Sequence, residues 1–390
     1  MKESISIKNF GPVKEIHIAD IKPLTVLIGE SGSGKSTLMK VLAIFRHIEK
    51  IRQIRSYLKH SGLSKSPFRI RMESYWANSG FASYLTPGTE VVYTTSYESG
   101  KNYILRFSDG KLHGTAQKDL IDKKDLCLTK IAYVSELRSV IPYWVKEGAS
   151  IKASLGFYFN EVFGDFRNAS EQITFMNMDY LKVRFKVMHT SRGSKYSIVP
   201  TSNISTKTVS GDYEIGFESS SSGMQNAAPL LLIVKYLARH YGFEKGFNDS
   251  VLKYLLSSDR LTDFKFVSNV KDLDKRVFMH IEEPELSLFP DAQCALITDI
   301  IASAFDNPIN ETHIILSTHS PYIVNHLNLL IRAYEKDSKA PGAQYPHEKL
   351  SVYRGHEGKL EDLMVQNEKL VNTNPLSQTI NDIYDQYNQL

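Results

Sequence analysis

The sequence predicts an α/β fold with a mixed-sheet core, an antiparallel β subdomain and a helical insertion. The first observation is the apolar segment "LTVLI" at 24–28, which precedes a glycine-rich loop and a helical segment, "STLMKVLAIF". The second is that "VFMHIEEPE" (277–285) and "THIILSTHS" (312–320) begin as buried strands and end in polar residues. The third is a set of segments that alternate apolar and polar residues, as half-buried strands do.

The elements follow in chain order. Strands are expected in "SISIKNF" at 4–10 and "VKEIHIAD" at 13–20, and the helix after the glycine loop is expected to continue through "RHIEKIRQIRSYLKH" at 46–60. Further strands are expected at 90–96, 102–107, 130–136 and 180–189, and helices at 154–163 and 229–240. The chain has no internal repeat and no long heptad array.

Composition is that of a globular protein, with 390 residues, 42% apolar, 23% charged and a net charge of +4. No apolar run approaches the length that crosses a bilayer, and the N-terminus lacks an apolar signal core. The two cysteines, Cys127 and Cys294, have no metal-ligand spacing and no disulfide pattern. These features favour a cytoplasmic protein.

The loop "GESGSGKST" has the spacing G-x-x-x-x-G-K-[ST] between a strand and a helix, which is the context of a P-loop. Its glycines let backbone N–H groups turn toward phosphate, and the helix N-terminus favours an anion. Lys35 is expected to reach the β- and γ-phosphates of ATP, and Ser36 to bind Mg²⁺. The expected nucleotide-binding residues are Gly29, Glu30, Ser31, Gly32, Ser33, Gly34, Lys35, Ser36 and Thr37.

The second predicted strand end carries two carboxylates, Glu282 and Glu283. Glu282 is placed to hold the magnesium ion through water, and Glu283 to take a proton from, or orient, the attacking water. His319, past the next strand, can hydrogen-bond the γ-phosphate and this water. The alternatives are a solvated acidic turn and a structural histidine. The order P-loop, acidic strand, histidine favours catalysis.

In this order the chain resembles the ABC-type ATPases, and most closely the AAA-15/AAA-21 and OLD-like ATPases, which are related to SMC-like repair ATPases. The resemblance spans nearly the whole chain. It is carried by "IKNFGPV" at 7–13, "GESGSGKST" at 29–37, "SSSGMQ" at 220–225, "IEEPELSLFP" at 281–290 and "STHSPYIV" at 317–324. It implies one ABC-type head, with lobes at 1–135, 136–275 and 276–390.

The resemblance implies a signature motif at Ser221, Ser222 and Gly223, which binds the γ-phosphate held by the P-loop of a second copy. ATP is therefore expected to hold a homodimer together, with higher oligomers open. Glu136 and Arg138 resemble residues near the Q-loop, although surface ion pairing is an alternative for both. Without the resemblance, "SSSGMQ" is equally consistent with a serine turn that caps the next helix.

The chain departs from the family pattern at several positions. Glu282 replaces the usual aspartate, and Ser287 and Phe289 stand where this group often has histidines. Pro229 is expected to bend the signature helix or to lie in its first turn. Phe10 is expected either near the adenine or in the core of a strand.

Five functions share such a site. A transporter subunit is disfavoured by the roughly sixty residues between the signature and Glu282, and a long-coil DNA clamp by the missing heptads. The 71 residues after His319 lack room for a nuclease domain with D-x-D acids. The favoured prediction is a switch that controls a separate nuclease or toxin in prokaryotic anti-phage defence. The alternative is a coil-less, RecF-like or SMC-like DNA-binding ATPase.

Two surfaces are predicted for partners. Basic residues cluster between 40 and 75, which indicates either a DNA-binding face or a solvated helix that docks an acidic protein. They are Lys40, Arg46, Lys50, Arg52, Arg55, Lys59, Lys65, Arg69 and Arg71, with Arg46, Lys50, Arg52, Arg55 and Lys59 as the DNA candidates. The insertion at 238–270, with Tyr241, Phe243 and Phe247 expected to be exposed, is the predicted effector-docking surface.

Overall fold

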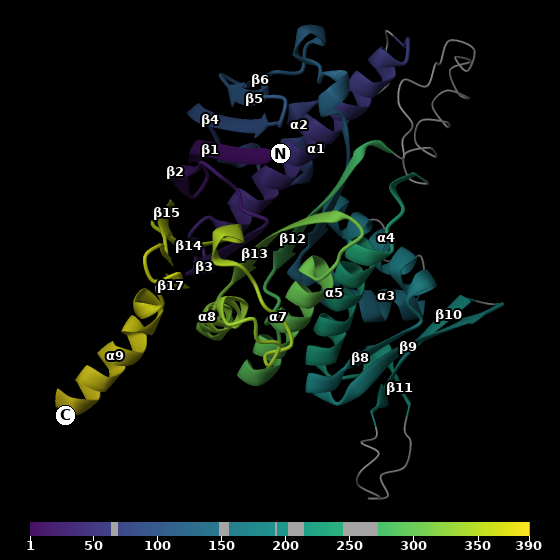
Figure 1. Cartoon of the computed structure of the whole chain (residues 1–390), viewed down its shortest axis with the longest axis vertical. Helices are drawn as coiled ribbons and strands as arrows, with labels where there is room; N and C mark the ends of the chain where they lie inside the picture. Colours follow the sequence, from purple (N-terminus) through teal and green to yellow (C-terminus); the bar gives the residue numbers. More distant parts are fainter. Residues whose placement is uncertain (64–68, 148–155, 192, 202–213, 245–271, 390) are drawn as a thin grey trace, which may run out of the picture.

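The computed structural model describes residues 1–63, 69–147, 156–191, 193–201, 214–244 and 272–389, and it shows a mixed α/β fold (Figure 1). Its helices are α1 (Lys35–His60), α2 (Met72–Asn78), α3 (Ile141–Glu147), α4 (Gly156–Gln172), α5 (Ser222–Arg239), α7 (Pro290–Phe305), α8 (Pro321–Glu335) and α9 (Asn374–Gln389). In the described part of the chain, no helix combines the length and the apolarity that a membrane span needs.

The strands are β1 (Lys2–Phe10), β2 (Val13–Ile18), β3 (Leu24–Gly29), β4 (Leu85–Ser96), β5 (Asn102–Ser108), β6 (Lys111–His113), β7 (Cys127–Val134), β8 (Phe175–Met178), β9 (Val183–Thr190), β10 (Gly193–Pro200), β11 (Ile215–Gly216), β12 (Asp274–Glu282), β13 (Glu311–Thr318), β14 (Leu350–His356), β15 (Lys359–Asp362), β16 (Met364–Val365) and β17 (Leu370–Val371).

A six-stranded mixed sheet, in the order β15-β14-β3-β13-β12-β7, forms the centre of the molecule. Strands β14, β3, β13, β12 and β7 are parallel, and β15 is antiparallel to β14. The carboxyl ends of parallel strands meet at one edge of a sheet, where α/β proteins bind ligands. Residues that follow β3, β7, β12 and β13 therefore meet at that edge, together with the end of β14 itself.

Antiparallel sheets complete the fold. One has the order β2-β1-β4-β5-β6 and another β11-β10-β9-β8, and β16 pairs with β17. The mixed-sheet core and the antiparallel β subdomain of the sequence prediction are thereby confirmed. The helical insertion falls mainly on 245–271, which lies outside the described residues, and the division into lobes at 135 and 275 stays a prediction.

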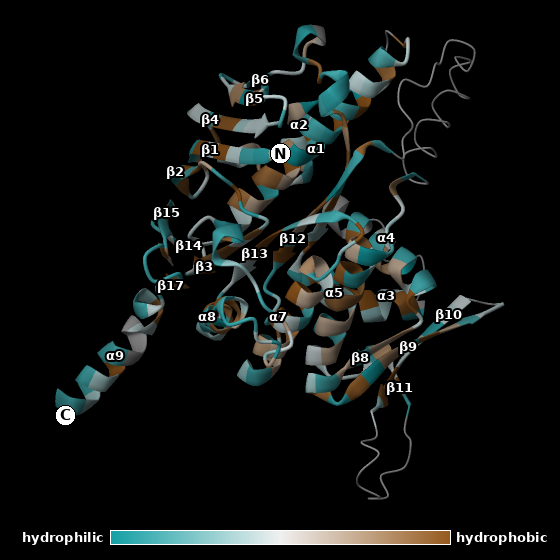
Figure 2. Ribbon diagram, viewed as in Figure 1, coloured by the Kyte–Doolittle hydropathy of each residue, from teal (hydrophilic) through white to brown (hydrophobic). Residues whose placement is uncertain are grey.

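The central sheet is buried on both faces. Leu27, Ile315 and Tyr133 pack with α1 and the β1–β4 sheet in one core, whereas Val26 and Leu316 on alternate positions pack in another. The second core also holds much of α4, α5 and α7, whose hydrophobic sides are brown in Figure 2. Each large apolar side chain buried in this way contributes about 1.5–3 kcal/mol.

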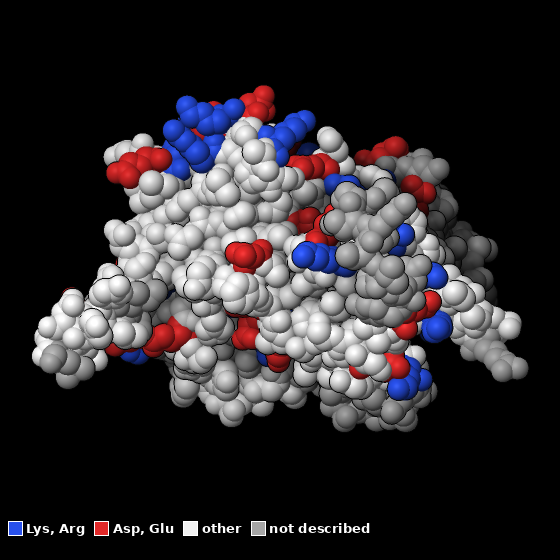
Figure 3. All heavy atoms as spheres, turned by 90° about the horizontal axis from the view of Figure 1, so that it is seen from below, with Lys and Arg blue, Asp and Glu red and all other residues white. Residues whose placement is uncertain are grey.

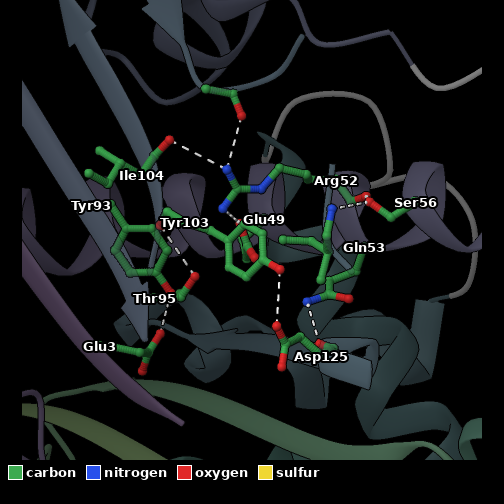
Figure 4. Close-up of polar contacts among 12 residues, drawn as sticks. Glu3, Glu49, Arg52, Gln53, Ser56, Tyr93, Thr95, Tyr103, Ile104 and Asp125 are labelled. Carbon is green, nitrogen blue, oxygen red and sulfur yellow. Dashed lines mark hydrogen bonds and ion pairs between the residues drawn. The ribbon is translucent and has the colours of Figure 1, made fainter. Parts of the chain in front are cut away.

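Two arginines of the predicted DNA-binding face are buried, so the sequence interpretation was wrong for them. Arg46 and Arg52 are each 1% exposed. The Nη2 of Arg46 lies 2.7 Å from the Oε2 of Glu3. Arg52 pairs with Glu49 and donates to the carbonyl oxygen of Gly114 at 2.9 Å (Figure 4). A buried charge is tolerated when it is paired with an opposite charge, and each of these arginines is paired with a glutamate inside the protein.

The remaining basic residues of that stretch are differently placed. Lys59, Arg69 and Arg71 are exposed, whereas Lys50 and Arg55 are half-buried. Lys65 lies outside the described residues. Helix α1 runs through the protein with most of its length packed, which explains why a basic sequence does not make a basic surface here.

The Glu3–Arg46 pair is expected to be a large contributor to stability. Replacing Glu3 by Gln leaves the Arg46 guanidinium buried without a counter-charge, so the free energy of unfolding should fall by about 3 kcal/mol in urea titrations. Arg46 also lies 4.2 Å above the Phe278 ring and 3.2 Å from the Nε2 of His280, so the loss should extend to strand β12.

The paired variant Glu3→Gln/Arg46→Met is the control, because it removes both charges, and most of the stability should return. The pKa of Glu3 is lowered: burial raises it, and Arg46 outweighs burial. Its contribution to stability is therefore complete above pH 4.5, the ordinary value, and is lost as the pH falls through the lowered pKa. Equal acid sensitivity of wild type and the paired variant would contradict this account.

Candidate functional site

The glycine loop joins β3 to α1 with a backbone that turns inward. Gly29, Gly32 and Gly34 all have positive φ, at 147°, 80° and 95°. Gly34 is the left-handed residue that precedes the first turn of α1, and Leu38 donates its N–H to the Gly34 carbonyl. Residues with a Cβ rarely adopt these angles, which explains why glycines occupy these positions. The loop therefore brings the N–H groups of successive residues and the N-terminus of the 26-residue helix α1 to one place.

Lys35 is the first residue of α1, and its side chain folds back onto this loop. Its Nζ donates to the carbonyl oxygens of Gly29 at 2.7 Å and Glu30 at 2.8 Å. Burial lowers its pKa, while the carboxylates of Glu283, Glu285 and Glu30 act in the opposite direction. Lys35 therefore feels the acidic turn after β12, so the structure brings the glycine loop and that turn together.

Gly355 on β14 is a site residue that the sequence interpretation missed. A Cβ on Gly355 would lie 2.9 Å from the Oγ of Ser33, and one on Gly29 would lie 2.3 Å from the Gly355 carbonyl oxygen. The backbones of β14 and the glycine loop are therefore in direct contact. A glycine inside a strand often marks such a close approach, and this was the signal available in the sequence.

Replacing Gly355 by Ala should distort the glycine loop and weaken ATP binding about tenfold, because the added methyl presses on Ser33. A fluorescent ATP analogue and a titration of each variant measure this. Gly164→Ala is the matched control, since its added Cβ meets nothing within 4 Å. Wild-type affinity of the Gly355 variant would show that the loop yields without cost.

Glu282 ends strand β12 and is 3% exposed. Its Oε1 accepts a hydrogen bond of 2.8 Å from the Tyr133 hydroxyl. Burial raises its pKa to about 7, the neighbouring Glu136 carboxyl adds to this, and Lys40 opposes it. Glu136, which resembled a Q-loop neighbour in the sequence, is thus beside Glu282 at the carboxyl ends of β7 and β12.

The residues at this position suit a magnesium ion. The Oε2 of Glu282 is buried and has no hydrogen-bond partner among the residues that the structure describes. Glu282 is buried and the neighbouring Glu136 is exposed; two carboxyl groups this close repel each other, and a hard divalent cation with oxygen ligands relieves that repulsion. Within the described ranges there is no group of three or more His, Cys, Asp or Glu that could hold a metal by itself. A magnesium bound through one or two carboxylates and phosphate does not need one.

Glu283 has an unusual backbone and faces His319. Its φ is 45°, and its N–H donates to the Ser317 carbonyl at 2.9 Å. The Nε2 of His319 lies 3.6 Å from the Oε1 of Glu283, and both side chains are 38% exposed. A non-glycine residue in the left-handed region costs free energy and often stands at a functional site. The turn therefore points Glu283 and His319 at the same accessible space.

Glu285 holds this pair together and was also missed in the sequence. Its Oε1 accepts the backbone N–H of His319 at 2.6 Å. Ser320, the next residue, caps α8 by accepting from the N–H of Ile323, and its Oγ donates to Gln293. The position of His319 is thus set by contacts on both sides of it.

Arg138 connects the acidic turn to helix α5. It is fully buried and donates to the carbonyl oxygens of Glu282 at 2.7 Å, Ser135 at 3.1 Å and Asn226 at 3.3 Å, and to that of Glu283. Burial lowers its pKa to about 10, against the nearby carboxylates. Surface ion pairing, one alternative for this residue, is therefore excluded.

Helix α5 begins at the predicted signature. Ser221 precedes its first turn, is exposed, and makes no capping hydrogen bond through its side chain to any residue in the described part of the chain. Ser222 is also exposed, whereas Gly223 is buried against the turn after β12. A Cβ on Gly223 would lie 2.9 Å from the Ser287 carbonyl oxygen. The hydroxyls and free N–H groups of the helix start are therefore available to an external anion.

The structure also tests the predictions for Phe10, Pro229 and Phe289. Phe10 is fully buried and packs 5.2 Å from the centroids of Trp76 and Phe81, so it lies in the core and not beside an adenine. Pro229 lies well inside α5, so it is not in the first turn. Phe289, which replaces a histidine of the group, is 76% exposed.

The predicted docking surface is wrong in its described part. Phe243 is 5% exposed and Tyr241 is only half-exposed. Their rings pack at 4.9 Å, and Tyr241 also lies 5.9 Å from the Tyr236 ring. These aromatics bury apolar area after α5 and do not offer it to a partner. Phe247 and the rest of 238–270 beyond 244 lie outside the described residues.

Comparison with known proteins gives one family. The family model described as AAA ATPase domain matches residues 1–133 and 158–324, well over half of the chain. No curated protein matches this chain. The solved structures it resembles include an SMC head bound to the C-winged helix domain of ScpA, at 14% identity and TM-score 0.43, covering 94% of this chain and 99% of that one.

Two further solved structures are similar at comparable levels. The recombination mediator RecF is 10% identical, with a TM-score of 0.37, over 93% of this chain and 98% of that one. The ADP conformation of an ATP-binding cassette of an ABC transporter is 11% identical, with a TM-score of 0.32, over 97% of this chain and 98% of that one. Because this likeness is too low to carry a functional argument, the function is inferred from the family and from the site residues.

Proposed function

Because the chain belongs to the AAA ATPase domain family, we propose that it binds and hydrolyses ATP as a dimerising switch. The observation that carries the proposal is the meeting of three segments at the carboxyl edge of the central sheet. The glycine loop, Glu282, Glu283 and His319 follow three adjacent parallel strands, β3, β12 and β13. Catalysis of phosphoryl transfer needs mainly positioning and electrostatic stabilisation, which such an edge supplies.

We assign roles by geometry. The loop from Gly29 to Thr37 holds the phosphates, with Lys35 released from its loop carbonyls to meet them. Ser36 and Glu282 hold Mg²⁺, which supplies charge neutralisation when bound. Glu283 orients the attacking water and accepts its proton, and His319, beside it, donates to the γ-phosphate.

The second copy completes the site in this proposal. Ser221, Ser222 and Gly223 stand at the start of an 18-residue helix with exposed hydroxyls, which suits the γ-phosphate held by another subunit. ATP then stabilises the closed dimer by binding it better than the open form. The Gly223 contact with the Ser287 carbonyl and the Arg138 bond to Asn226 tie this helix to the acidic turn of the same subunit.

Subunit mixing tests the composite site. Lys35→Ala and Ser221→Arg subunits should each be inactive alone, because every site in either homodimer lacks one component. In a mixed heterodimer one site keeps both Lys35 and Ser221. A one-to-one mixture should recover roughly a quarter of wild-type ATPase activity, since half of the dimers are mixed and carry one intact site.

The control mixes Lys35→Ala subunits with subunits that carry both substitutions. No intact site can form in those dimers, so activity should stay at the level of Lys35→Ala alone. Recovery in the control, or full activity of Ser221→Arg by itself, contradicts a site shared between subunits.

We further propose that the switch controls a separate nuclease or toxin in anti-phage defence, as the resemblance to OLD-like ATPases implies. The support is the family and the ATP-dependent change of state that the composite site provides. The test is a pull-down from extracts that express the native operon, with wild type and Glu283→Gln as bait. A defined partner that changes in amount between the two baits is expected. Cleavage of DNA or RNA by the purified chain alone would make it the effector instead.

DNA binding is the second candidate function, and it is equally consistent with the family. The structure weakens its sequence basis, because Arg46 and Arg52 are buried. On the face shown in Figure 3, acidic and basic side chains are interspersed around a large uncharged area, with basic groups gathered only at one edge. A salt titration of duplex binding distinguishes the candidates, since phosphate contacts give a steep loss of affinity with salt.

A further inference from the structure

A cavity of about 210 Å³ lies beside helix α1, on the face of β7 away from α5. Helix α1 contributes Ile44, His47 and Lys50 to the cavity lining, α2 contributes Tyr75, and β7 contributes Ile131 and Tyr133. None of the roles assigned above uses this cavity. Its volume equals that of about seven water molecules, which suits one ring with a small substituent and not a whole nucleotide.

Lys50 carries the charge of the cavity. It is half-buried, and no hydrogen bond or ion pair joins it to another of the residues that the structure describes. The nearby acids are occupied by a different lysine: the Nζ of Lys130 lies 2.8 Å from Asp165 and 3.7 Å from Glu161. Burial lowers the pKa of Lys50 and Lys130 adds to this, whereas the carboxylates of Glu161 and Asp165, both shared with Lys130, act in the opposite direction. A half-buried ammonium without a partner gains free energy from an anion that reaches it.

The lining also holds the Glu161 carboxylate, which lies 3.7 Å from the Nζ of Lys130, and the remaining walls are flat, apolar or neutral. The Tyr75 and His47 rings meet edge to face with centroids 5.6 Å apart, and Ile44 and Ile131 are aliphatic. Burial lowers the pKa of His47 to about 4, so it is neutral at pH 7 and does not add a second positive charge. Asn78 and Ser79 supply polar groups at the same cavity. Such a mixture of apolar walls with a few polar groups is typical of sites for small ring compounds.

We propose that this cavity binds a monocyclic organic anion, an aromatic carboxylate in its simplest form. The carboxylate pairs with Lys50, and the ring packs between Tyr75 and the aliphatic wall of Ile44 and Ile131. The ligand is distinct from ATP, since Lys50 lies fifteen residues along α1 from Lys35, about 22 Å at 1.5 Å per residue.

Tyr133 connects the cavity to the ATP site. Its ring is part of the cavity wall, while its hydroxyl donates to the Oε1 of Glu282 at 2.8 Å. The ring also stacks on His280 of β12 at a centroid distance of 5.7 Å. A ligand that packs against Tyr133 therefore acts on a residue bonded to the predicted magnesium ligand. This regulatory part rests on the proposed ATPase function, whereas the binding part does not.

Ligand-observed NMR on the full chain without nucleotide tests binding. Benzoate, nicotinate and orotate are the probes, and benzamide is the neutral counterpart of benzoate. At least one anion should bind wild type, with Lys50→Met weakening it at least tenfold, the loss expected for one charged hydrogen bond. Lys59→Met, on the exposed surface of the same helix, is the matched control and should leave binding unchanged.

Three results overturn the site. They are no binding by any of the three anions up to about 10 mM, equal binding to Lys50→Met, or equal binding of benzamide and benzoate. Circular dichroism of Lys50→Met establishes that a loss of binding is not a loss of folding.

A second measurement tests the coupling alone. At saturating anion, the KM for ATP should change at least twofold in wild type, and this change should vanish in Tyr133→Phe while NMR binding persists. Binding with an unchanged KM would retain the site and remove its link to Glu282. Absence of all ATPase activity, with anion binding intact, would count against the proposed function and not against the cavity.

Discussion

Replacing Glu283 by Gln is expected to lower ATP hydrolysis at least about 100-fold while ATP binding persists. The carboxylate at this position faces His319 at 3.6 Å and is 38% exposed, so it can reach a water beside the phosphate. An amide keeps the size and one acceptor oxygen but cannot take the proton. Stalled turnover should also accumulate the ATP-bound dimer, which size-exclusion chromatography with multi-angle light scattering detects.

Glu335→Gln is the control for this experiment, since Glu335 pairs with Arg332 at the C-terminal end of α8, about 20 Å along that helix from the end next to His319. It should keep wild-type hydrolysis. Glu285→Gln should have an intermediate effect, because Glu285 positions His319 by accepting its backbone N–H. Near-normal hydrolysis by Glu283→Gln would remove Glu283 from the catalytic role.

Replacing Arg138 by Met is expected to lower the free energy of unfolding by about 3–5 kcal/mol and to abolish ATPase activity. The substitution leaves four carbonyl oxygens, on Ser135, Asn226, Glu282 and Glu283, without their buried donor. The positive φ of Glu283 persists only while its surroundings hold it, so the acidic turn should relax. Urea unfolding and steady-state hydrolysis measure the two effects.

Arg138→Lys separates charge from geometry. An ammonium keeps the positive charge but cannot reach four carbonyls from one planar fork, so stability should recover only in part. Arg184→Met is the matched control, because Arg184 is an exposed arginine on β9 that donates to Asn177. Wild-type stability of Arg138→Met would show that water replaces the guanidinium at these carbonyls.

The parts of the site that are local in the chain could be predicted from sequence. The β3 strand, the glycine loop and α1 are contiguous, and their φ requirements select glycine at defined positions. The order of the remaining strands also indicated a mixed sheet. Gly355 could not be found in this way, because its role comes from pairing with β3 across more than 300 residues of chain.

The sequence interpretation of the charged residues was wrong in the opposite way, because it predicted exposed side chains where the structure has buried ones. Arg46 and Arg52 looked like surface residues because nothing in their neighbourhood reveals that Glu3 lies beside Arg46 in space. Glu49 is near Arg52 in sequence, but the burial of Arg52 depends on β5 and the chain at Gly114, because the carbonyl oxygens of Ile104 and Gly114 accept from its guanidinium. Burial is a property of the assembled sheets, and a list of basic residues along one helix does not contain it.

The position of β3 in the sheet also decides when the nucleotide site exists during synthesis. Both strands that pair with β3 come late in the chain, since β13 begins at Glu311 and β14 at Leu350. At about 5–20 residues per second, the ribosome finishes the glycine loop tens of seconds before either strand emerges. During that interval the apolar residues of β3 have no sheet to join. A nascent chain therefore carries a complete phosphate-binding sequence without a binding site, and the cell sees an ATP-responsive protein only after the C-terminal strands have closed the sheet.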